Sequence, residues 1–205
     1  MLLSMHIPKT AGVSFRKILA QLYGPGFVQY YWEITDAHGR VQREIPPGAT
    51  CVHGHFMAHA LSDKFPEAKL VTWVRDPVDR VISSYYHRLR EPDWRHPVCM
   101  ELHAKKLSVV EYARLELVRN EMARFFGEMQ PAEFAFIGVF EQLDHSMTRF
   151  FEEFSLPPVP IPRDNVNPER RTLHYEISSC EREQILEFNE RDAELYASCL
   201  DHARV

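Results

Sequence analysis

Residues 69–74 (KLVTWV) form an unbroken run dominated by β-branched and aromatic residues. Such a run is typical of a strand buried on both faces, as in a parallel sheet. Asp76 and Pro77 follow almost at once, and these residue types are favoured at the N-cap and the first position of a helix. Apolar residues then recur at helical spacing to about Arg90. A strand that passes directly into a helix is the unit from which folds of alternating strands and helices are built.

The same alternation continues along the chain. We expect strands at residues 1–7, 27–34, 50–56 and 134–140 and helices from residue 13 to the Gly-Pro-Gly at 24–26, and over 108–127, 143–154 and 178–202. Irregular connections are expected at residues 36–48, 91–107 and 156–171. These elements predict an α/β fold with a mainly parallel sheet flanked by helices, formed by residues 1–205 as a single domain. Ligands of such sheets bind beyond the carboxyl ends of the strands.

Composition excludes several classes of function. Lys and Arg number 24 against 29 Asp and Glu, and the resulting net charge of −5 argues against a general nucleic-acid partner. The four cysteines are scattered without a CxxC pair, so they form neither a zinc-ligand pattern nor a disulfide framework. No apolar run approaches the roughly 20 residues of a transmembrane helix, and no signal peptide is evident. We therefore expect a soluble, cytoplasmic protein.

The first candidate site is the segment 8–14 (PKTAGVS), which lies between an expected strand and an expected helix. Amide groups at a helix start favour an anion, and Lys9 adds a full positive charge, so the segment suits a phosphate. The sequence lacks the usual GxxxxGK[ST] pattern of a P-loop. The alternative is an ordinary strand–helix turn with a solvated lysine.

The second candidate is the segment 74–86 (VRDPVDRVISSYY). Arg75 stands at the exit of a strand, and Ser83 lies on the helix that follows. A guanidinium fork beside a hydroxyl suits a second phosphate. The alternative is that Arg75 pairs with Asp79 and Ser83 only packs.

The third candidate is a pair of histidines, His53 and His55, on either side of Gly54 at the end of an expected strand. Residues two apart on a strand point to the same side, so both rings are able to face one cleft. Three interpretations stay open from the residues alone: structural histidines, a metal site shared with Cys51 and His59, and general bases. The pattern does not complete a zinc site.

Two further segments have weaker signals. Residues 87–106 are locally basic, which fits a solvated surface or contact with an anionic or polyhydroxylated acceptor. The aromatic segment 27–32 is more typical of a core than of a platform for sugar stacking.

In combination, the motifs resemble those of the sulfotransferases. Residues 6–14 (HIPKTAGVS) are similar to the HxPKTGGTS-type loop for the 5′-phosphosulfate, and residues 74–86 to the RDPxxRxxSxYY element for the 3′-phosphate. The similarity extends to the carbohydrate group that includes heparan sulfate 2-O-sulfotransferase. It covers the order and spacing of the motifs and the HGH of residues 53–55, and it spans most of residues 1–155. At residues 11–13 the chain has Ala-Gly-Val where Gly-Gly-Thr is common, so one hydroxyl is lost.

The resemblance implies a P-loop-like fold and a reaction. It implies 3′-phosphoadenosine 5′-phosphosulfate as the donor and a hydroxyl, expected on a carbohydrate, as the acceptor. His55 and His53 are the implied catalytic histidines, with His55 preferred as general base, and Lys9 stabilises the leaving phosphate without a metal. The implied donor contacts are Lys9, Thr10, Ala11, Gly12, Val13, Ser14, Arg75 and Ser83, together with Arg170 and Thr172 of a late basic loop.

Two other functions remain as alternatives. A P-loop-type nucleotide kinase is disfavoured because the chain has neither a Walker lysine motif nor a clear acidic Mg²⁺ ligand after a strand. A non-catalytic module that binds a nucleotide or a glycan is disfavoured by the intact Lys9, Arg75 and histidine pair.

Overall fold

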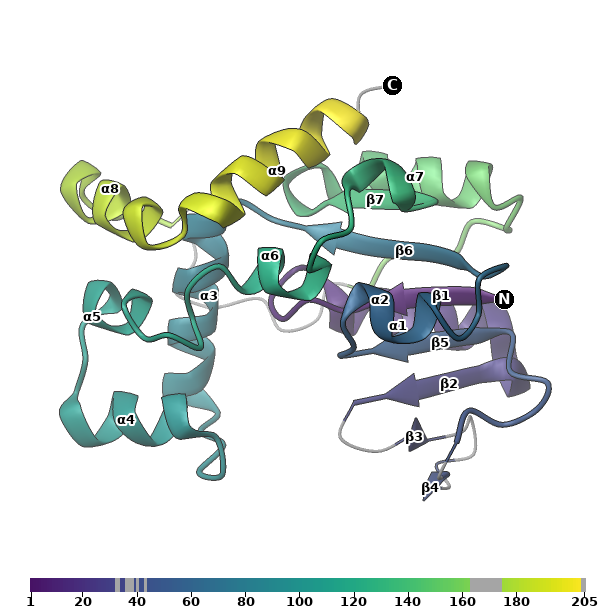
Figure 1. The fold of residues 1–205 in the computed structure, drawn as a ribbon, viewed down its shortest axis with the longest axis horizontal. Coiled ribbons are helices and arrows are strands. Elements are labelled where there is room, and N and C mark those ends of the chain that lie inside the picture. Colours follow the sequence, from purple (N-terminus) through teal and green to yellow (C-terminus); the bar gives the residue numbers. More distant parts are fainter. Residues whose placement is uncertain (32–33, 36–38, 40, 43, 163–174, 204–205) are drawn as a thin grey trace.

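The computed structural model describes residues 1–31, 34–35, 39, 41–42, 44–162 and 175–203. The strands of this part of the chain form one sheet in the order β4-β3-β2-β5-β1-β6-β7 (Figure 1). Their bounds are β1 Leu2–Met5, β2 Phe27–Tyr30, β3 Ile34–Thr35, β4 Val41–Gln42, β5 Cys51–Gly54, β6 Lys69–Val74 and β7 Phe136–Val139. The strands β2, β5, β1, β6 and β7 pair in parallel, and the short β3 and β4 pair antiparallel at one edge. The predicted mainly parallel sheet is confirmed.

Strand β1 is the middle one of the five parallel strands. Its four residues are buried, and its register places Ser4 opposite His53 of β5 and Val71 of β6. The next pair along, Met5 and Gly54, ends the ladder between β1 and β5. The three strands therefore end at the same edge of the sheet, where the predicted site segments begin.

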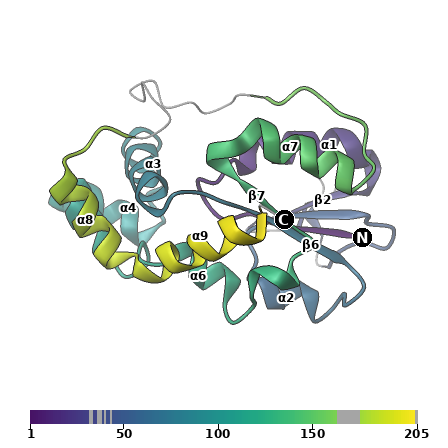
Figure 2. The same cartoon turned by 90° about the horizontal axis from the view of Figure 1, so that it is seen from above.

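Helices cover both faces of the sheet (Figure 2). Their bounds are α1 Gly12–Tyr23, α2 Ala58–Ser62, α3 Pro77–Arg90, α4 Pro97–Lys105, α5 Val109–Ala113, α6 Glu121–Phe126, α7 Leu143–Glu153, α8 Ser179–Phe188 and α9 Glu190–Ala203. Leu2 and Val71 lie in a core cluster with α1 and α7, whereas Leu3 and Leu70 lie in a cluster with α2, α6 and α9. Neighbouring residues of a strand thus feed opposite layers, as the period of a strand requires. No helix among those described is long and apolar enough to cross a lipid bilayer.

A group of helices extends from the carboxyl edge of the sheet (Figure 1). Helices α3, α4, α5 and α8 surround a third core cluster that includes Val81, Leu102, Tyr112 and Ile185. The expectation of an irregular segment at 91–107 is wrong here, because α4 lies within it. Pro97 is the first residue of this helix, and Val98, Cys99 and Leu102 are its buried residues. Val98 and Leu102 belong to the third core cluster. This packing with distant segments is not visible in the local Pro- and His-rich composition.

Two predicted helices are each divided in the structure. The expected helix over 108–127 consists of α5 and α6, separated by turns, and Asn120 before α6 has a left-handed backbone. The expected helix over 178–202 breaks into α8 and α9 at Asn189. The buried Asn189 side chain accepts a hydrogen bond from the amide of Asn120 at 3.0 Å and donates one to the carbonyl of Ile185 at 2.9 Å. Both breaks therefore meet at one tertiary contact that helical periodicity does not reveal.

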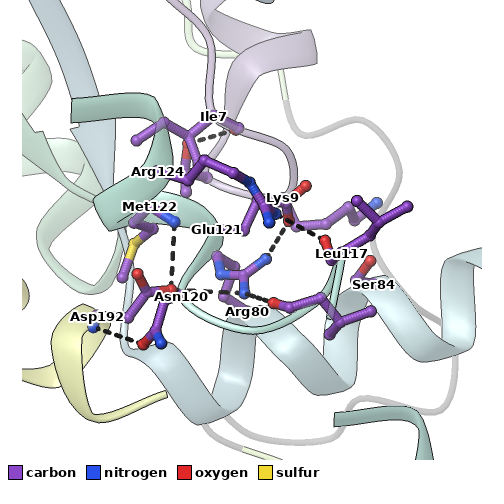
Figure 3. A network of polar contacts seen from close by, with 12 residues as sticks. Ile7, Lys9, Arg80, Ser84, Leu117, Asn120, Glu121, Met122, Arg124 and Asp192 are labelled. Atoms are coloured by element: carbon purple, nitrogen blue, oxygen red, sulfur yellow. Dashed lines mark hydrogen bonds and ion pairs between the residues drawn. The ribbon is translucent and has the colours of Figure 1, made fainter. Parts of the chain in front are cut away.

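A buried polar network joins α3, α6 and α9 (Figure 3). The fully buried Arg80 of α3 pairs with Glu121 of α6 and lies 3.6 Å from a carboxylate oxygen of Asp192 on α9. Asp192 also accepts hydrogen bonds from the amides of Met122 and Ala123 at 3.2 Å and 2.8 Å, so it caps the start of α6. The network fixes α3 and α6 beside the carboxyl edge of the sheet.

Candidate functional site

The turn between β1 and α1 has an unusual backbone. Lys9 and Ala11 have φ angles of 70° and 78°, in the left-handed region that residues other than glycine rarely adopt. Thr10 between them is buried, and its hydroxyl donates a 2.8 Å hydrogen bond to the carbonyl of Ile7. Strained backbone of this kind persists where the surroundings hold it, and it is concentrated at functional sites. The predicted phosphate loop is therefore held in one defined shape.

Helix α1 begins at Gly12, directly after this turn. In the described part of the chain no side chain caps the helix, and its first turn holds no acidic residue. The first amide groups of a helix have no partner within the helix, and together with the helix dipole they attract an anion. Among the other predicted loop residues Ser14 is buried and Ala11 and Val13 are partly exposed. Backbone amides, more than side-chain hydroxyls, are thus the groups that this loop offers to a ligand.

The ammonium group of Lys9 loses its proton more readily than that of an ordinary lysine. Burial lowers the pKa of Lys9 to about 8, and the positive charges of Arg75 and Arg90 act in the same direction. A cation kept near other cations in a partly buried position is stabilised by a bound anion. This arrangement fits a site for a highly charged phosphate compound.

Arg75 joins the second predicted motif to the first. Its side chain is only 3% exposed, and Nη1 donates a 3.1 Å hydrogen bond to the backbone carbonyl of Lys9. The guanidinium carbon lies 4.3 Å from the centre of the Phe140 ring, and Nε lies 4.0 Å from Oε1 of Glu141. The structure therefore brings Arg75 and the loop together, while its contact with a 3′-phosphate stays a prediction.

Three other residues of the second motif, Ser83, Ser84 and Asp79, differ in their burial and contacts. Ser83 is partly exposed on α3, whereas its neighbour Ser84 is buried and shares a 2.8 Å hydrogen bond with the hydroxyl of Tyr112. Asp79, the alternative partner of Arg75, is buried at the start of α3. Its Oδ1 accepts a 3.0 Å hydrogen bond from the amide of Tyr175 and lies 3.5 Å from Nη2 of Arg182.

His53 is part of the core. It is 1% exposed, and its Nδ1 shares a 2.8 Å hydrogen bond with the hydroxyl of Ser4 on the neighbouring strand. Burial lowers the pKa of His53 to about 3, with further contributions from His55 and Arg16. A neutral, buried ring of this kind is suited to holding the site together rather than to exchanging protons with a substrate.

His55 has the geometry of a base. Its partly exposed ring donates a 2.7 Å hydrogen bond from Nδ1 to the backbone carbonyl of His6. A carbonyl only accepts, so Nδ1 carries the proton and Nε2 carries the lone pair. Burial lowers the pKa of His55 below 6.5, and the bond to the His6 carbonyl partly offsets this. The ring is therefore neutral at pH 7, with Nε2 ready to accept a proton.

His6 is the residue of this cluster that the sequence-based prediction of individual site residues missed. Its ring stacks on His55 with 4.6 Å between the ring centres and on His53 with 5.2 Å. The signal lies in the strand register, because Met5 pairs with Gly54 and the next residues of both strands leave the sheet side by side. A sequence without known strand pairing does not show that register.

The described residues contain no group of three or more His, Cys, Asp or Glu side chains placed to hold a metal ion. The histidines stack face to face instead, and the suggested additional ligands Cys51 and His59 are respectively buried and exposed. Arg170 and Thr172, the two residues assigned to a late basic loop, lie outside the described residues. In the expected aromatic segment, Phe27 and Val28 are buried in the core.

Comparison with known proteins identifies the family. Residues 1–197 match the sequence profile described as the sulfotransferase family. The chain is similar to the solved structure of a sulfotransferase from Alicyclobacillus acidocaldarius, with 17% identity and a TM-score of 0.50 over 99% of this chain and 98% of that one. It is also similar to mouse sulfotransferase SULT7A1 complexed with PAP, with 11% identity and a TM-score of 0.47 over 91% of this chain and 62% of that one.

No curated protein sequence matches the chain. The bacterial structure nevertheless shows the fold, which is the P-loop-like α/β fold of sulfotransferases. Since the family profile covers nearly all of the sequence, the chain belongs to the sulfotransferase family.

Proposed function

We propose that this protein transfers a sulfuryl group from 3′-phosphoadenosine 5′-phosphosulfate to a hydroxyl group, with a carbohydrate as the expected acceptor. The observation that carries the proposal is the orientation of His55 beside the donor loop. Its Nδ1–H is held by the His6 carbonyl at 2.7 Å, which leaves Nε2 as the acceptor of a proton.

The donor residues follow from the geometry together with the family resemblance. The left-handed turn and the start of α1 present amides to the 5′-phosphosulfate, with Lys9 supplying charge. We assign Arg75 and Ser83 to the 3′-phosphate. The full set of proposed donor residues is Lys9, Thr10, Ala11, Gly12, Val13, Ser14, Arg75, Ser83, Arg170 and Thr172.

The proposed reaction needs one base and one charge stabiliser. The acceptor oxygen attacks sulfur while Nε2 of His55 takes its proton, and the bond from sulfur to the bridging phosphate oxygen breaks. Adenosine 3′,5′-bisphosphate leaves, and Lys9 with the loop amides stabilises the charge that develops on the bridging oxygen. A positioned base contributes roughly 10²–10⁴ in rate. The leaving group is already a phosphate, so the scheme requires no metal ion.

The arrangement after β6 supports this assignment over a kinase. The acidic residue at the end of that strand, Asp76, accepts a 2.9 Å hydrogen bond from the amide of Asp79 and lies 3.5 Å from Nη1 of Arg182. A carboxylate used as a helix cap and paired with an arginine is poorly placed to hold Mg²⁺ for phosphoryl transfer.

Thermal unfolding with two nucleotides tests the donor class. At 100 times Kd, a ligand of the folded state adds about 2.7 kcal/mol, which raises Tm by roughly 5–10 °C in a chain of this size. We expect such a rise with adenosine 3′,5′-bisphosphate and a much smaller one with ATP and Mg²⁺ at equal concentration. A larger rise with ATP and Mg²⁺ would overturn the proposal in favour of a kinase.

A further inference from the structure

The side chain of His6 lies between the donor loop and the proposed base. Its ring stacks on the ring of His55 at 4.6 Å with an interplanar angle of 21°, and on the ring of His53 at 5.2 Å with an angle of 18°. Its Nδ1 shares a 3.0 Å hydrogen bond with the hydroxyl of Tyr31. The ring is thus held by His53 of β5 and by Tyr31 and His55, which directly follow β2 and β5.

The His6 ring also lies against the donor loop, at Gly12. A Cβ added at Gly12 would lie 1.7 Å from Nε2 of His6, far inside any possible contact distance. The absence of a side chain at Gly12 therefore allows the first residue of α1 to lie against the imidazole. The same ring touches the donor loop and the base.

We propose that His6 is a positioning residue that sets the place of His55 relative to the donor loop. The inference rests on the proposed function for its catalytic meaning, but the contacts that carry it do not depend on that function. The backbone carbonyl of His6 accepts a 2.7 Å hydrogen bond from Nδ1 of His55 and so fixes the tautomer of that ring. The His6 ring fixes the orientation of the His55 ring by stacking.

Of the two contacts between His6 and His55, the stacking of the rings is the one that a substitution at position 6 removes. Among the residues that the structure describes, the titratable groups that face His55 are His6, His53 and Tyr31, whose ring lies 4.8 Å away, while α6 presents the apolar Phe125. Any residue at position 6 supplies the carbonyl, whereas stacking on the His55 ring requires an aromatic ring at that position. Misplacement of a reacting group by about 1 Å costs as much as 10²-fold in rate.

Two variants separate packing from the hydrogen bond. His6→Ala keeps the carbonyl and removes the ring, and His6→Phe keeps a flat ring but loses the bond to Tyr31. We expect His6→Ala to lower kcat by roughly 10- to 100-fold, with the affinity for adenosine 3′,5′-bisphosphate near the wild-type value. We expect His6→Phe to retain most of the wild-type kcat.

An NMR titration of ¹⁵N-histidine-labelled protein provides a readout that does not require turnover. In the wild type, His55 is expected as the Nδ1–H tautomer with a pKa below 6.5. In His6→Ala the ring becomes more solvated, so its pKa is expected to rise toward 6.5, and in His6→Phe it is expected to stay near the wild-type value. Circular dichroism confirms that each variant is folded before it is compared.

The outcomes distinguish this inference from the proposed function. An unchanged His55 titration and an unchanged kcat in folded His6→Ala would overturn the positioning role. A His6→Phe variant as impaired as His6→Ala in both readouts would also overturn it, because the imidazole itself would then be required. A wild type that transfers no sulfuryl group, yet shows the expected change of the His55 titration in His6→Ala, would refute the proposed function and leave the positioning role supported.

Discussion

Arg75 and Lys9, 66 positions apart in the chain, are joined by a 3.1 Å hydrogen bond from the guanidinium of the first to the backbone carbonyl of the second. The bond connects the exit of β6 to the left-handed turn after β1. The hydrogen bond therefore connects the proposed 3′-phosphate site at Arg75 directly to the proposed 5′-phosphosulfate loop at Lys9.

Replacement of Arg75 is expected to weaken binding through the 3′-phosphate. A charge-assisted hydrogen bond is worth about 1.5–3 kcal/mol, so Arg75→Ala should lower the affinity for adenosine 3′,5′-bisphosphate by roughly 10- to 150-fold. Calorimetry should show a much smaller loss for adenosine 5′-phosphate, which lacks the 3′-phosphate. Equal losses for both nucleotides would mean that Arg75 serves only the loop or the fold.

Replacement of Lys9 is expected to reduce turnover more than donor binding. Its charge matters most when the bridging oxygen has become negative, and interactions specific to the transition state appear in kcat. Because the pKa of Lys9 is lowered to about 8, kcat/KM of the wild type should fall as the pH rises through that value and the charge is lost.

Steady-state kinetics of Lys9→Ala, with exposed Lys64→Ala as a matched control, test this role. A rise in KM without a change in kcat would reduce Lys9 to a charge that only holds the donor.

The network around Asp192 is expected to contribute strongly to stability. Asp192→Ala removes the cap of α6 and one carboxylate near the fully buried Arg80. Breaking such a buried pair costs about 3–5 kcal/mol of unfolding free energy. Urea denaturation should show this loss, whereas exposed Glu194→Ala on the same helix should change stability by less than about 0.5 kcal/mol. Similar values for the two variants would refute the role assigned to the network.

His53 makes stability depend on pH in a defined direction. Its pKa is about 3 in the folded protein, below the 6.5 of an unfolded chain, so the unfolded state binds the extra proton between these values. The stability from its neutral burial is present above pH 6.5 and is lost as the pH falls toward 3. This single group contributes a slope of at most about 1.4 kcal/mol per pH unit.

Unfolding free energies of the wild type and His53→Gln, measured between pH 7 and 4, isolate that contribution from the carboxylates. The variant should show a shallower decrease on acidification. Identical slopes would mean that His53 titrates normally in the folded state.

Much of the fold could be predicted because strand and helix periods alternate clearly. Residues 69–74 and 77–90 have the predicted bounds, and Asp76 accepts from the amide of Asp79 as an N-cap does. The errors are α2, which no sequence pattern predicts, β4, which lies within the expected irregular segment 36–48, and several elements of the helical extension. There the break at Asn189 and the helix α4 depend on contacts between distant segments.

The site was predictable to the extent that its residues follow strand ends. Lys9, Arg75 and His55 follow three parallel strands, and neighbouring strand ends bring them to one edge. The residues alone do not distinguish His53 from His55, and the preference for His55 comes from the family resemblance; the physical distinction depends on Ser4 and on the carbonyl of His6. Those contacts require the strand register.

The role of His55 is the centre of the proposed chemistry. His55→Ala should lower turnover by about 10²–10⁴ and leave bisphosphate binding nearly intact, because the lost group serves the acceptor. In the wild type, the acidic limb of the rate profile should lie below pH 6.5, since burial lowers the pKa of His55. That limb should vanish in the variant.

Transfer of ³⁵S from labelled 3′-phosphoadenosine 5′-phosphosulfate to a panel of glycans and small alcohols measures this directly. We expect labelled product with the wild type and with exposed His145→Ala, and a loss of about 10²–10⁴ in rate with His55→Ala. Absence of labelled product from the wild type with every acceptor, despite donor binding, would contradict sulfuryl transfer. Near-normal transfer by His55→Ala would contradict its role as the base.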